Sequence, residues 1–299
     1  MDIEKVIKDN RQMKAVVGMS KEEFLGLIPS FSKAWLQEMK KINPDRKRKM
    51  GGGRKGFLPT MEHKLFAILL YIKTYPTFDL LGFLTNRERT RACRSTHFLL
   101  KVLKNALGKE IVLPDRKITS VEEFFKKFPE MKDVFLDGTE RPVQRPKNGK
   151  KRKKLYSGKK KTTTRKSIIV SNEDKKILLL TPAKSGRRHD KRLADKAQLP
   201  NYIPKDVCIV ADTGFQGIQH IHPNTLIPDK PTKHHSLTDK QKQNNRIISC
   251  FRIKVEHAIG GIKRMKAASD IYRNKLSNLD DTFMLISAGL WNYHLRQSA

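Results

Sequence analysis

Acidic side chains are scarce in this sequence. Its 299 residues hold 30 Asp and Glu against 63 Lys and Arg, a formal net charge of +33. Such an excess is far larger than solubility requires, so it indicates a polyanionic partner, and nucleic acid is the first candidate. The hydrophobic share of 37% is still enough to build a real core.

Long apolar runs are missing as well. No stretch approaches the roughly 20 apolar residues that span a bilayer, and no lipidation signal is visible. The N-terminal segment MDIEKVIKDNRQMK has no apolar signal region. The sequence therefore predicts an intracellular protein with no membrane partner.

Cysteine is rare, and its spacing excludes a zinc site built only from cysteines. The three cysteines are Cys93, Cys208 and Cys250. We expect free thiols that behave as small buried side chains. Four histidines without a nearby cysteine lie in a segment rich in proline and lysine: His220, His222, His234 and His235. Here we expect a loop that contacts DNA or crosses solvent.

The first third of the chain is predicted to be helical. Apolar residues recur at helical spacing in 23–39 and again in 61–74. Between them, residues 43–59 combine glycine, proline and charge, which predicts a mobile basic linker. Two more helices are expected, over 78–84 and from about 87 to 107, the second ending with Gly108 as its cap.

These helices have the spacing of a helix-turn-helix over about 57–108. Its last helix would present arginines at the N-terminal end, where groove contacts are usually made. They are Arg87, Arg89, Arg91 and Arg94. A plain three-helix bundle with a solvated arginine face fits the same pattern, and both interpretations stay open.

From about residue 133 the pattern changes to short apolar runs separated by turn residues. The runs expected to form strands are 134–136, 167–170, 177–180 and 207–210, and helices are expected near 190–197, 244–264 and 281–295. The first and last runs each lead into an aspartate, Asp137 or Asp212, as buried strands deliver carboxylates to a sheet edge. Strands with covering helices imply an α/β sandwich.

A basic tract occupies 141–166, and Tyr156 is its only aromatic residue. One interpretation is a disordered, solvated loop. The other is a phosphate-binding arm beside Asp137. The position of the tract between an acidic strand end and the next strand favours the arm. The residues that we assign to DNA binding here are Lys151, Arg152, Lys153 and Lys154.

Isolated carboxylates in a basic domain suit phosphodiester chemistry. Two metal ions about 4 Å apart can assist the attacking and leaving oxygens together, and magnesium prefers carboxylate ligands. Asp137, Asp212 and Glu256 are candidate ligands. Helical spacing places Glu256 one turn from Arg252 and puts Lys263 on the same face. An ordinary surface ion pair between Arg252 and Glu256 is the alternative.

The order LDGTERP, VADTGFQG and R-x3-E-x6-K resembles the DDE transposases of bacterial insertion sequences. The stretch GGGRKGFLPTMEHKLFAILLYIKTYPTFDLLGFL also resembles the helix-turn-helix that precedes their cores. The resemblance implies an α/β protein. Its RNase H-like catalytic domain, a mixed sheet covered by helices, would span 126–299, after an all-α helix-turn-helix region over 1–125.

The resemblance also implies a mechanism and partners. Asp137, Asp212 and Glu256 would bind two Mg²⁺ or Mn²⁺ ions, with Arg252 and Lys263 near DNA or supporting the glutamate. A homodimer on the nucleoid, in the bacterial cytoplasm, would cut double-stranded DNA at terminal inverted repeats and transfer the 3′ hydroxyl to target DNA. Ser249 stands where the signature has tyrosine. A catalytically silent or repurposed DNA-binding protein and a host nuclease on the same core are the alternatives.

Between the first two acids, SGRRHDKRL resembles a histidine-aspartate pair of the same family. We expect Asp190 to cap the following helix, while a direct metal role stays open. Arg187 and Arg188 are candidate DNA contacts. Asp133 is a rival first ligand, but it falls at the entrance of its strand, so Asp137 is preferred.

Overall fold

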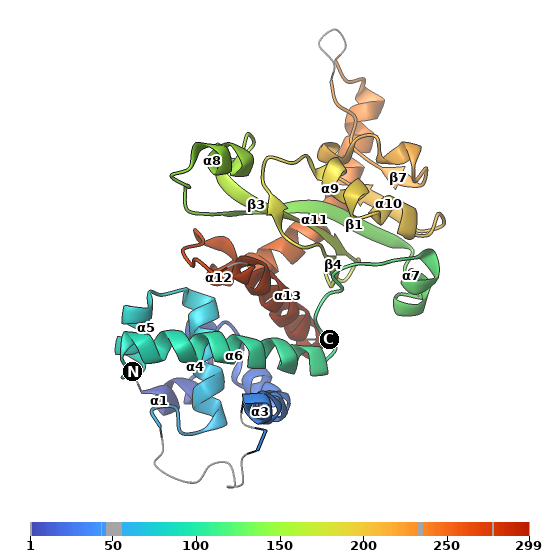
Figure 1. Cartoon of the computed structure of the whole chain (residues 1–299). Helices are drawn as coiled ribbons and strands as arrows, with labels where there is room; N and C mark the ends of the chain where they lie inside the picture. The colour runs from blue at the N-terminus through green and yellow to red at the C-terminus, as the bar shows by residue number, and fades with distance from the viewer. Residues whose placement is uncertain (1, 43, 46–55, 232–235, 277, 299) are drawn as a thin grey trace. The chain divides into compact units, whose positions relative to one another are not determined.

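The computed structural model describes residues 2–42, 44–45, 56–231, 236–276 and 278–298. Much of the predicted linker, residues 46–55, lies outside this part of the chain, as do His234 and His235. The chain divides into two compact units (Figure 1). The first comprises Met1–Leu113, Ile262–Asp270 and Thr282–Ala299, and the second Pro114–Gly261 and Ile271–Asp281.

The regular secondary structure of the first unit is all helical in its described residues. Its helices are α1 (Ile3–Lys8), α2 (Asn10–Val16), α3 (Lys21–Ile42), α4 (Met61–Thr74), α5 (Phe78–Leu84), α6 (Arg89–Lys109), α12 (Lys266–Ser269) and most of α13 (Leu279–Ser298). The helices expected over 23–39, 61–74, 78–84 and 281–295 are confirmed. Within the described residues, no helix combines the length and the apolar content needed to cross a membrane.

Helix α6 does not end where the sequence predicts. Gly108 lies inside the helix, which continues to Lys109 with Glu110 as its cap residue. Ile111 takes the left-handed conformation, with φ +54°. The amides of Ile111 and Val112 then bond back to the carbonyls of Gly108 and Leu107, the hydrogen-bond pattern of a Schellman motif. The prediction of Gly108 as the cap is therefore wrong, because the β-branched Ile111 occupies the left-handed position after the helix.

Replacing Ile111 by glycine is expected to raise the free energy of unfolding by about 1 kcal/mol. A left-handed conformation costs a residue with a Cβ roughly 1–2 kcal/mol, and glycine avoids this cost at some entropic expense. Ile111 is 88% exposed, so little packing is lost. Denaturant unfolding would measure the change. Ile111→Ala keeps the Cβ and serves as the control, and equal stability of all three proteins would contradict the prediction.

The second unit contains the sheet and its covering helices. The strands are β1 (Asp133–Pro142), β2 (Tyr156–Ser157), β3 (Thr162–Ser171), β4 (Ile177–Leu180), β5 (Lys184–Ser185), β6 (Cys208–Ala211) and β7 (Thr225–Leu226). The helices are α7 (Val121–Lys127), α8 (Gly149–Leu155), α9 (Asp190–Lys196), α10 (Leu199–Tyr202), η1 (Thr213–Phe215), η2 (Ile218–His220) and most of α11 (Asp239–Lys263). All four expected strands are confirmed, and so are the helices near 190–197 and 244–264.

The sheet is mixed. Its order is β2-β3-β1-β6-β7, and β4 and β5 both pair with β3. Strand β1 runs antiparallel to β3 and parallel to β6; the two long strands β1 and β3 are the green arrows at the centre of the sheet in Figure 1. A mixed sheet with covering helices, preceded by a helical region, is the fold class that the sequence predicts.

The two faces of β1 pack against different helices. Val134 and Leu136 belong to one apolar cluster with Leu193 and Ala194 of α9. Phe135 points to the other face, where the Lys254 Nζ of α11 lies 5.6 Å from its ring centroid. Odd-numbered β1 side chains therefore face α11 and even-numbered ones face α9, because strand side chains alternate.

One prediction about this part of the chain is wrong, and so is the disordered-loop alternative for the basic tract, while the favoured phosphate-binding arm stays a prediction. Strand β1 does not end at Asp137, because pairing with β3 continues to Pro142; only the parallel pairing with β6 stops, at Leu136. The basic tract 141–166 is also no structureless loop, since it holds α8, β2 and the ends of two strands. Arg141 is buried, with its guanidinium 4.9 Å from the Tyr272 ring centroid, so part of the tract does pack inside the unit.

Candidate active site

Asp137 and Asp212 lie on adjacent strands. The last pair between parallel strands β1 and β6 is Leu136 with Ala211, and each aspartate is the next residue in its chain. Neighbouring strands are about 4.8 Å apart, so the two carboxylates start from neighbouring backbone positions. By alternation, Asp137 shares the α11 face with Phe135.

The Asp137 carboxyl lies in an unfavourable place for a negative charge. Burial raises its pKa from 3.8 to about 6, and the neighbouring Asp212 charge also raises it. The Gly138 amide, which donates a hydrogen bond of 2.6 Å to Oδ1, and the charges of Arg252 and Lys159 act in the opposite direction. The ionised form is therefore less stable than that of an ordinary aspartate, and an additional positive charge near the carboxylate would stabilise it.

Asp212 is ionised more readily. Burial raises its pKa, but Arg252, Thr213 and Lys159 outweigh this effect and hold the pKa below its usual value. The Arg252 guanidinium lies 3.9 Å and the Lys159 Nζ 3.8 Å from Oδ2. The Thr213 hydroxyl donates to Oδ1 at 3.0 Å. The two aspartates thus differ in charge behaviour although they are neighbours.

Glu256 is separated from Asp212 by the side chain of Arg252. It is on α11 with its side chain 58% exposed, and Oε1 is 3.8 Å from the same Arg252 nitrogen that approaches Asp212. Within the described residues, no three His, Cys, Asp or Glu side chains are close enough to hold one metal ion. Asp137 and Asp212 suit a divalent cation as oxygen ligands, whereas the Arg252 guanidinium lies between Asp212 and Glu256.

Asp190 does not cap α9 as the sequence predicts. His189 is the residue before the helix, without a side-chain capping bond, and Asp190 is the first helical residue. Its Oδ1 instead pairs with Lys166 Nζ at 2.9 Å. A Cβ built on Gly138 would lie 2.5 Å from this oxygen, so Asp190 packs beneath Gly138 of β1, on the α9 face. This is the face opposite to the Asp137 side chain.

Sequence reasoning missed a buried charge cluster below the acids. Lys166, with 7% of its side chain exposed, contacts Asp190 and also Glu140, at 3.1 Å from Oε1. The signal that could have found it is alternation along β1, which places Glu140 on the same face as Gly138. The sequence around Lys166, in a tract of many lysines, nevertheless does not indicate that this one side chain is buried.

Asp133 lies at the opposite end of β1 from the candidate site. It is four residues from Asp137, about 13 Å along a strand. Burial and Glu173 raise its pKa, while Lys254 lowers it. Asp133 therefore belongs to a separate group of charges at the start of the strand, although the regular strand does put it on the same face as Asp137.

The predicted helix-turn-helix arginines differ in their surroundings. Arg87 is half-buried and donates to Thr85 Oγ1 at 2.9 Å and to Ser95 Oγ at 2.5 Å; burial lowers its pKa. Arg89 pairs with Asp79 at 3.5 Å and Arg91 with Glu88 at 3.8 Å, both on the surface. Arg94 is exposed. Three of the four are thus open to a ligand, and Arg87 mainly ties its own turn together.

The basic residues predicted in the second half are mostly exposed. The exposed ones are Lys151, Arg152, Lys153 and Lys154 on α8, and Arg187. Arg188 is half-buried, and its carbonyl accepts a hydrogen bond of 3.1 Å from Lys166. Lys263 is the last residue of α11, half-buried and within the first unit.

One of the histidines is structural. His222 is fully buried, and its ring nitrogens lie 3.2 Å from Thr225 Oγ1 and 2.9 Å from the Pro204 carbonyl. The expectation of a solvent-crossing or DNA-contacting loop is therefore wrong for His222, because its ring is enclosed by hydrogen-bond partners.

Comparison with known proteins gives two matches. Residues 136–292, more than half of the chain, match the family model described as DDE superfamily endonuclease. The chain is 28% identical over 289 residues to a probable transposase for insertion sequence element IS702 from Microchaete diplosiphon, covering 97% of this chain and 96% of that protein. No solved structure matches. Both matches agree with the resemblance of the ordered motifs, and the mixed, helix-covered sheet is consistent with this family.

Proposed function

The chain belongs to the DDE superfamily of endonucleases, and from this premise we propose that it is a DNA transposase of the insertion-sequence type. It would cut double-stranded DNA at the terminal inverted repeats of its element and join the freed 3′ hydroxyl to target DNA. The relative named as a probable transposase, aligned over nearly the full length of both chains, supports this choice over a nuclease with no strand-transfer step.

The observation that carries the proposal is that Asp137 and Asp212 lie on adjacent strands, each directly after the last pair between β1 and β6. Two Mg²⁺ or Mn²⁺ ions, when bound, would activate the attacking oxygen and neutralise charge on the phosphorus. Asp137 and Asp212 would hold them, and Glu256 would complete the ligands when the Arg252 guanidinium leaves it for a DNA phosphate.

Binding to DNA would use both parts of the chain. The helical region, residues 1–125 with a helix-turn-helix at about 57–108, would recognise the element ends, and residues 126–299 would carry the chemistry. Phosphate contacts by the exposed lysines and arginines of α8, by Arg187 and Arg188, and by Lys263 would make affinity fall steeply with salt. We expect a homodimer, because two ends must be brought together, acting on nucleoid DNA in the cytoplasm.

Cleavage at low metal concentration is expected to rise about tenfold per pH unit below pH 6 and to level off above it. The pKa of Asp137 is about 6, and its protonated form cannot bind a cation, so activity is lost as pH falls through this value. Higher metal concentration should move the midpoint to lower pH. Single-turnover rates between pH 5 and 8 would measure this, and a flat profile would contradict it.

A gel assay with the DNA that flanks the gene tests the proposed function. Purified protein with Mg²⁺ or Mn²⁺ should cut at the inverted repeats and join the 3′ ends to a second DNA. Binding without cleavage would instead indicate a catalytically silent or repurposed DNA-binding protein. Cleavage that ignores the repeats would indicate a host nuclease on the same core.

A further inference from the structure

We propose that the cationic pocket around Tyr156, next to the turn that carries Lys159, receives one unpaired nucleotide of the DNA substrate, with its base stacked on Tyr156. This inference rests on the proposed function, which supplies the DNA. It goes beyond the phosphate-binding arm, because it assigns to the basic tract a site for a nucleobase.

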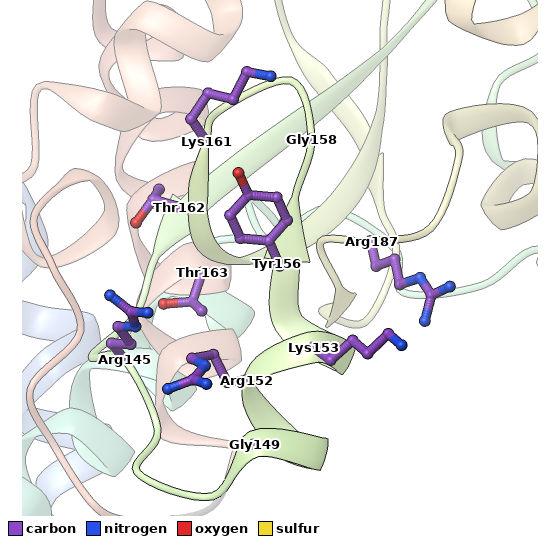
Figure 2. A pocket seen from close by; sticks show the side chains of 10 residues that line it. All are labelled: Arg145, Gly149, Arg152, Lys153, Tyr156, Gly158, Lys161, Thr162, Thr163 and Arg187. Atoms are coloured by element: carbon purple, nitrogen blue, oxygen red, sulfur yellow. The ribbon is translucent and has the colours of Figure 1, made fainter.

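The pocket has a volume of about 720 Å³ and lies between α8, β2 and the start of β3. Cations dominate its lining: Arg145, Arg152, Lys153, Lys161 and Arg187. None of these five forms an ion pair with an acidic side chain in the described part of the chain. Figure 2 shows Arg145 and Arg152 on one side of Tyr156, and Lys153 and Arg187 on the other. The lining is therefore suited to an anionic ligand that brings several negative oxygens.

Tyr156 makes the pocket more than a phosphate site. It is a β2 residue opposite Thr163, and it is 43% exposed although it is a large aromatic side chain. A half-exposed aromatic ring among arginines and lysines is the combination that binds single-stranded nucleic acid, since the cations hold the backbone and the ring stacks on a base. The Tyr156 ring is therefore the surface that we assign to the base.

The size of the pocket favours a single nucleotide. Small-molecule sites have volumes of roughly 300–1,000 Å³, a range that suits one nucleotide. A Cβ built on Gly149 or Gly158 would meet no atom within 4 Å, so the space beside the backbone there is open. In a duplex each base is stacked and paired, and its face becomes available only after it leaves the helix.

The turn at 158–161, between β2 and β3, connects the pocket to the candidate active site. Gly158 and Lys161 line the pocket, and between them Lys159 extends to within 3.8 Å of Asp212 Oδ2. A nucleotide held on Tyr156 would therefore belong to the DNA close to the cut. Keeping it out of the duplex would open the DNA end on which Asp137 and Asp212 would act.

Binding of two matched DNA ends tests the proposal. One is a fully paired duplex of the element end, and the other carries three unpaired nucleotides at the cut position; both are measured by fluorescence anisotropy in EDTA, so that neither is cleaved. Wild type should bind the tailed end about tenfold more tightly, since stacking one base is worth a factor of that order. Tyr156→Phe keeps the ring and should keep this preference. Tyr156→Leu should lose it while its affinity for the paired duplex and its melting temperature stay unchanged.

A third DNA, with abasic sites in the tail, separates the base from its phosphates. It should bind wild type no better than the paired duplex does. Equal binding of tailed and paired DNA by wild type, a preference retained in Tyr156→Leu, or full affinity for the abasic tail would each overturn the proposal. None of these outcomes touches the proposed function, which fails separately if wild type neither binds nor cuts the paired end.

Discussion

Replacing Asp137 by asparagine is expected to slow DNA cleavage by at least about a thousandfold while DNA affinity in EDTA changes less than about twofold. The amide has nearly the same shape but cannot supply the negative oxygen that a divalent cation requires. Most affinity should come from basic side chains that this change leaves in place. Gel cleavage and binding assays on the same preparation would measure both effects.

The same variant is expected to be more stable than wild type above pH 6 when no divalent ion is present. Because the pKa of Asp137 is raised from 3.8 to about 6, the folded chain binds more protons than the unfolded chain between these values. Wild-type stability therefore falls as pH rises through this window, and the loss persists above it. Asparagine carries no charge and avoids the loss. Urea unfolding at pH 4 and pH 8 should show a difference in the free energy of unfolding between wild type and Asp137→Asn at pH 8 only.

The control is Asp206→Asn, the same chemical change at an exposed acid just before β6. It should leave cleavage, binding and stability as in wild type. Added Mg²⁺ or Mn²⁺ should stabilise wild type and Asp206→Asn but not Asp137→Asn. Cleavage by Asp137→Asn at a rate near that of wild type would remove Asp137 from the active site.

Replacing Lys166 by methionine is expected to destabilise the protein by about 3–5 kcal/mol, the cost of leaving buried charges without their partner. Its ammonium group forms ion pairs with Glu140 and Asp190, at 3.1 and 2.9 Å, and its side chain is almost fully buried. Burial lowers the Lys166 pKa, but the two carboxylates outweigh burial and raise it. The stabilisation is therefore fully present at neutral pH and is lost only as pH rises through the raised pKa. Urea unfolding at pH 7 would measure the loss.

Neutralising the partners should restore much of this stability. Lys166→Met combined with Glu140→Gln and Asp190→Asn leaves no unpaired charge, so the triple variant should be more stable than the single one. Lys132→Met, at an exposed lysine, should change stability by less than about 0.5 kcal/mol. A loss below 1 kcal/mol for Lys166→Met would show that the cluster does not depend on its cation.

Periodicity predicted the elements better than their ends. The apolar run before Asp137 and the run before Asp212 each form a strand, and the helix of Glu256 lies where helical spacing puts it. The end of α6 was misplaced because Ile111 adopts a conformation that usually favours glycine. The end of β1 was misplaced because pairing with β3 continues where pairing with β6 stops.

By itself, the sequence determined the family and the alternation of helix and strand, and it predicted the class of partner and the candidate acids, since charge, periodicity and motif order are local properties of the chain. Only the tertiary structure decided how the charges are arranged. It placed Asp137 beside Asp212, put the Arg252 guanidinium between Asp212 and Glu256, and buried Lys166 beneath the site. These relations join residues from separate segments, and pairing between strands and helices sets them, so no spacing along the chain could reveal them.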